Sequence, residues 1–75
     1  MELGLLAYPN PASETIIIEN RISIKQEVQI TDSAGRLVKI MTLNPMEKTK
    51  IYVGDWPAGV YLLQAEGQVY KIIIS

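Results

Sequence analysis

Residues 27–35 read Glu-Val-Gln-Ile-Thr-Asp-Ser-Ala-Gly, and this stretch decides the fold class. Val28 and Ile30 alternate with polar residues, which is the period of a strand with one buried face and one solvated face. Asp32 stands at the first position of a turn and Gly35 at the fourth, a composition that reverses the chain through a type I turn and a bulge. A half-buried strand that ends in a reversing turn predicts an antiparallel sheet.

The same two patterns recur along the rest of the chain. Eleven Ile, five Val, four Thr and four Tyr favour strands, and no apolar spacing of a long amphipathic helix occurs. In residues 48–53, Thr49, Ile51 and Val53 share a face opposite the lysines. Strands are expected at residues 3–7, 14–19, 26–31, 36–43, 48–53, 60–65 and 69–74. These short segments between turn signals predict an all-β fold, a small antiparallel β-sandwich.

Three further turn signals separate these strands. Trp56-Pro57-Ala58-Gly59 places a proline with preset φ at the second position and a glycine that permits positive φ at the fourth. Glu66-Gly67 predicts a tight hairpin loop. Tyr8-Pro9-Asn10-Pro11-Ala12 predicts a stiff elbow that cannot lie inside a sheet, because each proline removes an amide donor and extends its predecessor.

Two segments are apolar on both faces. Val60-Tyr61-Leu62-Leu63 and Ile72-Ile73-Ile74 fit central strands, or strands whose outer face something else covers. Only Ser75 follows the second segment. A terminal strand at a sheet edge is a template for recognition by another protein or for dimerisation of the isolated domain, while the alternative is a last strand that is simply docked.

Composition excludes several classes of function. The 75 residues fit one domain, 1–75, and they contain no Cys and no His, so no thiol or imidazole is available to a nucleophile or a metal. We predict no metal site and no cofactor. A net charge of −1 without a basic patch argues against nucleic acid. The apolar runs are too short for a membrane helix, and residues 1–7 lack a signal-peptide pattern; the chain either stays where it is made or is part of a longer exported protein.

The remaining polar and aromatic residues suggest little catalysis. Asp32 and Asp55 are the candidates for an acidic pair, but both stand near turns, where Asp usually accepts local backbone hydrogen bonds. An enzyme is therefore not expected. The aromatic residues have two interpretations, either core packing with hydroxyl groups at the rim or a carbohydrate-stacking strip. They are Trp56, Tyr8, Tyr52, Tyr61 and Tyr70.

Four of these segments, taken in order, resemble the C-terminal sorting domain of the type IX secretion system of Bacteroidetes. The matching segments are Tyr8-Pro9-Asn10-Pro11-Ala12, Ile30-Thr31-Asp32 with Gly35-Arg36-Leu37-Val38, Pro57-Ala58-Gly59-Val60-Tyr61, and Lys71-Ile72-Ile73-Ile74. The resemblance covers residues 8–75. It departs from the family at Trp56, where a smaller aliphatic residue is usual, and at Ser75, where many members have Lys or Arg.

The resemblance implies an immunoglobulin-like sandwich of about seven strands that serves as a non-catalytic secretion signal. It implies a cargo domain ahead of this one, with residues 1–7 partly in the junction. The cargo would cross the periplasm and the outer-membrane translocon, and a sortase-like cysteine protease would then remove the domain. The cargo would be secreted, or attached to anionic lipopolysaccharide at the cell surface. The alternative function is a small carbohydrate-binding or adhesion sandwich appended to a secreted enzyme.

By position, the resemblance also implies candidate residues for partner recognition. They are Gly35, Arg36, Pro57, Gly59, Tyr61, Lys71, Ile72, Ile73, Ile74 and Ser75. The two glycines also have a plain backbone role, and Tyr61 a plain packing role. Arg36 and the terminal strand are therefore the residues that we expect to contact a partner.

Overall fold

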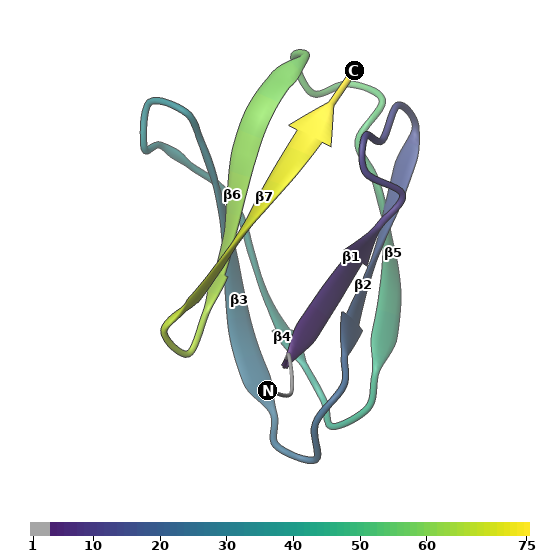
Figure 1. Ribbon diagram of the computed structural model, residues 1–75, viewed down its shortest axis with the longest axis vertical. Helices are drawn as coiled ribbons and strands as arrows, with labels where there is room; N and C mark the ends of the chain where they lie inside the picture. The colour runs from purple at the N-terminus through teal and green to yellow at the C-terminus, as the bar shows by residue number, and fades with distance from the viewer. Residues whose placement is uncertain (1–3) are drawn as a thin grey trace.

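Seven antiparallel strands form two sheets that pack face to face in the computed structural model, which describes residues 4–75 (Figure 1). The strands are β1 (Leu5–Tyr8), β2 (Thr15–Asn20), β3 (Gln26–Asp32), β4 (Leu37–Leu43), β5 (Lys48–Tyr52), β6 (Gly59–Ala65) and β7 (Gln68–Ile74). One sheet has the order β1-β2-β5 and the other β4-β3-β6-β7. The predicted all-β, immunoglobulin-like sandwich is confirmed. Within residues 4–75, no helix is long and apolar enough to cross a membrane.

The expected strands agree with the observed ones to within two residues at each end. The first expected strand begins at Leu3, which lies outside the described residues. Val28 and Ile30 are fully buried while Glu27 and Gln29 are exposed, and Ile51 and Val53 are buried opposite exposed lysines. The period-2 pattern therefore identified the buried face correctly.

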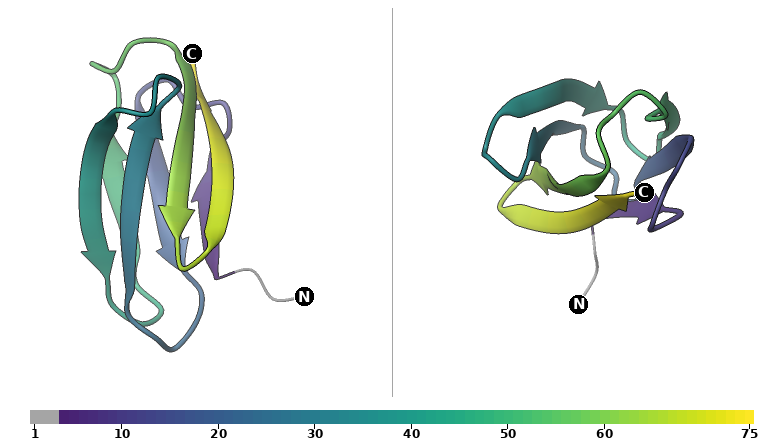
Figure 2. Two further views of the ribbon diagram at one scale, coloured as in Figure 1. Left: turned by 90° about the vertical axis from the view of Figure 1, so that its left-hand side faces the viewer. Right: turned by 90° about the horizontal axis from the view of Figure 1, so that it is seen from above.

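The core lies between the two sheets; in the left panel of Figure 2 the sheet β4-β3-β6-β7 faces the viewer and the sheet β1-β2-β5 lies behind it. Every strand contributes at least one buried apolar side chain. The buried apolar residues are Leu5, Ala12, Ile16, Ile18, Val28, Ile30, Leu43, Ile51, Val53, Tyr61, Leu63, Ala65, Ile72 and Ile74. Since they come from segments far apart in the sequence, the core forms only when both sheets have assembled and packed against each other.

The tight turns have the predicted geometry. Gly35 has φ of 85°, and its amide donates to the Asp32 carbonyl at 2.9 Å. The β3–β4 register shifts beside this turn, as expected for a bulge. Glu66 and Gly67 both have positive φ, 49° and 78°, which defines a type I′ hairpin between β6 and β7.

The connection between β5 and β6 differs from the expected turn. The hydrogen bond that closes it runs from the Trp56 amide to the Val53 carbonyl at 3.0 Å, so the turn spans residues 53–56 instead of 56–59. Gly59 does have positive φ, at 156°. Pro57 and Gly59 therefore follow the turn and lie where the chain enters β6.

A buried polar network holds the opposite end of the sandwich together. The Asn20 side-chain amide donates to the carbonyls of Ile24, Leu43 and Asn44 at 2.8, 3.3 and 2.9 Å. Its Oδ1 accepts from Gln26 Nε2 at 2.8 Å, and Gln26 in turn donates to the Gly4 carbonyl at 3.0 Å. One side chain thus bonds to three carbonyl groups, one ahead of β3 and two at the end of β4.

Asn20→Ala should lower the free energy of unfolding by about 2–3 kcal/mol, because buried carbonyl groups lose their donor. Asn44→Ala is the matched control, since its side chain is exposed and its contribution to the network is a backbone carbonyl. Urea denaturation of both variants measures the difference. Equal stability of the two variants would contradict a structural role for the network.

Candidate functional site

Four segments far apart in the sequence meet at one end of the sandwich, the upper end in Figure 1. They are the Tyr8–Ala12 elbow, the Asp32–Arg36 turn, the Pro57–Tyr61 loop and the residues Lys71–Ser75. Ala12 bridges to Ile74, Ile74 pairs with Gly59, and Tyr61 pairs with Asp32. We call this region the motif end.

Antiparallel pairing explains why these segments converge. β1, β3 and β7 end at this side of the sandwich, whereas β2, β4 and β6 begin there. Residues that precede or follow those strands are therefore brought together, and Asn10 bonds to Ile73 although 63 positions separate them along the chain. Local patterns determine the strands, and the pairing between strands then places all four segments at one end.

One carboxylate organises the β3–β4 turn. Asp32 Oδ1 accepts from the amides of Ala34 and Arg36 at 2.9 Å each, and Oδ2 accepts from Arg36 Nε at 3.0 Å. Hydrogen bonding from the Arg36 amide is the largest cause that holds the pKa of Asp32 below its ordinary value of 3.8, and the Ala34 amide and the guanidinium act in the same direction. The turn thus fixes its own conformation and the direction of the Arg36 side chain.

Arg36 presents a positive charge at the surface of the motif end. Its side chain is 81% exposed, and its Nε donates to Asp32. Within residues 4–75, no hydrogen-bond partner is found for the two outer nitrogens of its guanidinium. The outer nitrogens of the guanidinium are therefore free to bind an oxygen acceptor of another molecule. Arg36 follows Gly35 directly, so the glycine that closes the turn also sets where the charge lies.

Tyr61 has a structural role. Its ring is 4% exposed, and its hydroxyl donates to the Pro57 carbonyl at 2.6 Å. A tyrosine near the start of the sixth strand, bonded to backbone a few residues upstream, is the tyrosine corner of immunoglobulin-like sandwiches. The half-buried Trp56 packs on it with ring centroids 5.3 Å apart. Tyr61 therefore shapes the loop from within the core and presents little surface of its own to a partner, whereas Pro57 is exposed on the loop.

The elbow covers the outer edge of β7. Asn10 Nδ2 donates to the Lys71 carbonyl at 3.1 Å, and Asn10 Oδ1 accepts from the Ile73 amide at 3.0 Å. Directly beyond, the Ala12 amide donates to the Ile73 carbonyl and the Ser75 amide donates to the Ala12 carbonyl, both at 2.9 Å. The Asn10 side chain and the Ala12 backbone together bond to β7 as a short parallel strand would.

The recognition residues expected on the last strand divide into two groups. Ile72 and Ile74 are buried in the core, whereas Lys71 is exposed and Ile73 is 39% exposed on the outer face. Ser75 is exposed but held by its backbone bond to Ala12. Lys71, Ile73 and Ser75 are therefore the exposed residues of this segment, and the edge of this part of β7 is already occupied by the elbow.

A surface pocket of about 170 Å³ lies between the two loops of the motif end. The Asp32 turn lines one side with Ser33, Ala34 and Arg36, and residues 57–61 line the other. Its wall combines a charged side chain with backbone and small apolar groups. Asp32, the carboxylate that lines this pocket, is bonded to the Ala34 and Arg36 amides and to Arg36 Nε.

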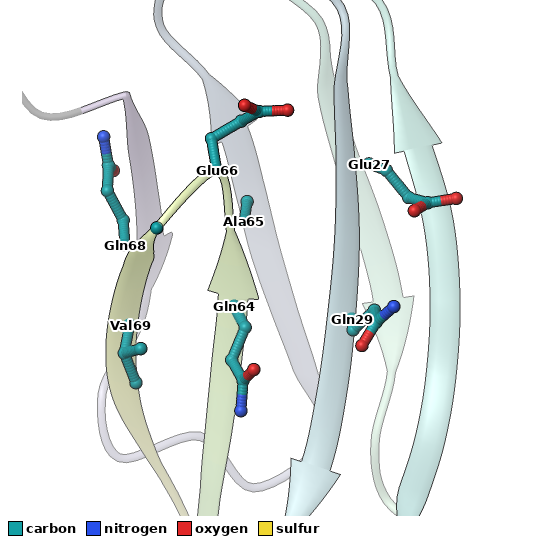
Figure 3. Close-up of a pocket in the computed structure, with 8 residues that line it drawn as sticks. Glu27, Gln29, Gln64, Ala65, Glu66, Gln68 and Val69 are labelled. Atoms are coloured by element: carbon teal, nitrogen blue, oxygen red, sulfur yellow. The ribbon is translucent and has the colours of Figure 1, made fainter.

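A second pocket, of about 310 Å³, lies on the outer face beside the β6–β7 hairpin, away from the motif end (Figure 3). Gln29 and Gln64 line it together with Val69, and the side chains of Glu27 and Glu66 leave different elements without converging. Within residues 4–75, no three His, Cys, Asp or Glu side chains are grouped so that they could hold a metal ion.

The aromatic residues are dispersed. Tyr61 is buried, and Tyr8 and Tyr70 are half-buried with hydroxyls bonded to Glu19 and Gln68. The Glu19 hydrogen bond is the main reason that the pKa of Tyr8 is raised above 10.0. Tyr52 alone among the tyrosines is largely exposed in the described part of the chain. This arrangement agrees with the core interpretation and supplies no continuous stacking strip.

Asn10 holds the motif end together through its bonds to β7, and the sequence patterns do not single it out. They predict a stiff elbow, but they give no sign that the Asn10 side chain bonds to β7. Its position between two prolines is the signal that could have found it, because prolines remove the local amides that an Asn side chain would otherwise bond.

Comparison with known proteins identifies one family. A family model described as "Secretion system C-terminal sorting domain" matches residues 6–75. The search of curated proteins gave no match. The search of solved structures gave none either.

The Asp32 carboxylate should make stability fall at acid pH. Because its pKa is lower in the folded state than the ordinary 3.8, ionised Asp32 stabilises the fold above that pH, and this contribution is lost as the pH falls through the folded pKa. The stability difference between the wild type and Asp32→Asn should therefore be constant near neutrality and shrink below pH 3.8. Urea unfolding across this range measures it, with Asp55→Asn as the control; a difference independent of pH would contradict the assignment.

Asn10→Ala should open one stretch of the β7 edge. The Ile73 amide loses its acceptor, so its hydrogen exchange should accelerate roughly five- to tenfold. The Ser75 amide, which donates to the Ala12 carbonyl, provides the internal control and should change less. Amide exchange followed by NMR reads both, and an unchanged Ile73 rate would show that the Asn10 bond is absent in solution.

Proposed function

We propose that this chain, which belongs to the family of type IX secretion C-terminal sorting domains, is the non-catalytic signal that its outer-membrane translocon reads at the motif end. The family match over residues 6–75 shows that the chain belongs to this family, and the immunoglobulin-like sandwich agrees with it. The chain is thus a C-terminal secretion signal, attached to a cargo protein that is secreted or displayed on the cell surface.

The position of the motif end is the observation that supports this reading. β1 begins at Leu5, which pairs with Asn20 at the opposite end of the sandwich. A cargo that precedes the domain would join the fold at that opposite end. The motif end would then remain uncovered, and a receptor could bind it while the cargo is still attached.

The exposed groups at the motif end define the chemistry of the partner surface. Arg36 offers guanidinium N–H groups, Lys71 an ammonium group, and Ile73 an apolar side chain. A complementary surface carries carboxylates beside an apolar patch. In this proposal Gly35, Pro57, Gly59 and Tyr61 set the shape of the loops, Ile72 and Ile74 hold the last strand in the core, and Ser75 fixes its end.

Recognition by addition of a receptor strand along residues 71–75 is disfavoured, because the elbow already bonds to the outward-facing groups there. A receptor that reads the side chains of Arg36, Lys71 and Ile73 needs no rearrangement of the fold. We therefore favour docking of the folded motif end.

We further propose that residues 1–75 act as one unit and that the cleaved bond lies upstream of the elbow. Leu5–Tyr8 are paired with β2, so a protease that needs an extended substrate would find it ahead of Leu5. The protease is a sortase-like cysteine enzyme supplied by the secretion system. It would release the cargo or join it to anionic lipopolysaccharide.

The test fuses residues 1–75 behind a signal peptide and an enzymatic reporter in a bacterium with a type IX system. The wild-type fusion should reach the cell surface or the medium, and it should stay in the periplasm of a translocon mutant. Arg36→Gln and Lys71→Gln should each reduce export several-fold, because they remove exposed charge without touching the core.

Arg21→Gln is the matched control, since Arg21 is exposed at the opposite end and its amide bonds to the Gly4 carbonyl. Truncation of residues 71–75 is avoided because it removes two core residues, Ile72 and Ile74, and would unfold the signal. Retention of the folded wild-type fusion in the periplasm would overturn the proposed function. Full export of the Arg36 and Lys71 variants would overturn only the proposed reading surface.

A further inference from the structure

Two strands, one in each sheet, present the same outward pair of side chains. β5 ends with Lys50-Ile51-Tyr52, and β7 contains Lys71-Ile72-Ile73. In each run the central isoleucine is buried and its two neighbours are exposed. Each strand therefore offers a lysine on its outer face and, two residues later, an apolar or aromatic side chain on the same face.

Both runs point toward the motif end. Tyr52 is opposite the first residue of β2, and Ile73 is opposite the second residue of β6. Since β2 and β6 begin at the motif end, β5 and β7 both run toward it (Figure 1). Lys50 and Tyr52 consequently flank the motif end on the three-stranded sheet, while Lys71 and Ile73 flank it on the four-stranded sheet.

The Tyr52 ring lies against the backbone of Gly54. A Cβ at position 54 would be 2.5 Å from Cζ of Tyr52 and 2.9 Å from its Cε1, closer than non-bonded carbon atoms pack, and it would also overlap the hydroxyl oxygen. Gly54 does not have the positive φ of Gly35, Gly59 and Gly67, so the backbone does not require a glycine there. The missing side chain instead makes room for the ring.

This contact holds in place an aromatic ring that the core does not use. Tyr52 is 61% exposed, and it lies outside the cluster of buried apolar residues. Tyrosine is one of the residues that contribute most to protein interfaces. A ring that is already held in one position loses little conformational freedom when a partner packs on it, so the contact with Gly54 prepares Tyr52 for binding.

We propose that Lys50 and Tyr52 form a second contact with the receptor that reads the motif end, equivalent to the contact of Lys71 and Ile73 on the other sheet. This inference rests on the proposed function and extends its reading surface. The receptor holds the end of the sandwich from both sheets, with a carboxylate opposite each lysine and an apolar group against Tyr52 and Ile73. Gly54 is a positioning residue that acts through the Tyr52 ring.

NMR of the full 75-residue chain tests whether Gly54 positions the ring. The ring current of Tyr52 should shift the α-proton signals of Gly54 in the wild type, and Tyr52→Ala should return them to ordinary glycine values. Tyr52→Phe keeps the ring and should leave the signals shifted. Equal α-proton shifts in the wild type and in Tyr52→Ala would contradict the positioning role.

The reporter fusion described above tests the contact itself. Tyr52→Ala and Lys50→Gln should each reduce export several-fold, whereas Tyr52→Phe and Lys48→Gln should be exported as the wild type is. Lys48 is the matched control because it is exposed on the same strand but lies toward the opposite end of the sandwich, where it pairs with Glu19. Urea unfolding of the purified chains should give equal stabilities, since the substituted side chains are all exposed.

Gly54→Ala supplies a test that leaves Tyr52 in the sequence. The added methyl group displaces the ring, so this variant should lose export as Tyr52→Ala does. In the Tyr52→Ala background the same substitution should have no further effect, because Gly54 acts only through the ring. Additive losses from the two substitutions would show that Gly54 has a separate role.

Failure of this inference is distinguishable from failure of the proposed function. Retention of the wild-type fusion in the periplasm would overturn both. Full export of Tyr52→Ala or of Lys50→Gln, together with reduced export of Arg36→Gln and Lys71→Gln, would overturn the second contact alone. A loss of export that follows a loss of stability in Tyr52→Ala would show that the ring acts in folding, and would overturn it as well.

Discussion

The hydrogen bonds between the elbow and β7 are the constraint on which the motif end depends. Asn10 and Ala12 together bond to the carbonyl or amide groups of Lys71, Ile73 and Ser75. These bonds connect the segment between β1 and β2, in one sheet, to the last strand of the other sheet. Without them, β7 would present an open edge at the point where the four segments converge. The bonds therefore both fix the end of the sandwich and determine which surfaces of β7 a partner can reach.

In the β3–β4 turn, too, one side chain has two roles. Asp32 satisfies the amides of a turn that contains a left-handed glycine, and its second oxygen holds the Arg36 guanidinium. A side chain needed for folding thus also orients the exposed charge. Tyr61 is comparable, because its hydroxyl fixes the Pro57 carbonyl and with it one wall of the pocket. The residues proposed for recognition and those that hold the turns are neighbours here, so a loss of export caused by Gly35 or Tyr61 variants would not separate the two roles.

Much of this fold could be predicted from local patterns. Alternation at residues 27–31 and 48–53 identified the buried faces, and the Asp32–Gly35 and Glu66–Gly67 turns have the geometry that their residues favour. The features that escaped prediction depend on pairing between distant segments. The bonds of Asn10 to β7 and of Asn20 to three carbonyls join residues that lie close together only once the sheets have assembled. The division of the last strand into buried Ile72 and Ile74 and exposed Lys71 and Ile73 likewise required knowledge of which face meets the core.

The surface of the motif end exists only when the domain is folded. Each segment of the motif end is short, and each contributes one or two accessible groups. Their arrangement arises because antiparallel strands return repeatedly to the same end. An unfolded chain has the same residues but separates Asn10 from Ile73 by 63 positions, so it cannot present them together. A receptor that reads the assembled motif end would therefore distinguish folded from unfolded signals without any chemical step in the domain itself.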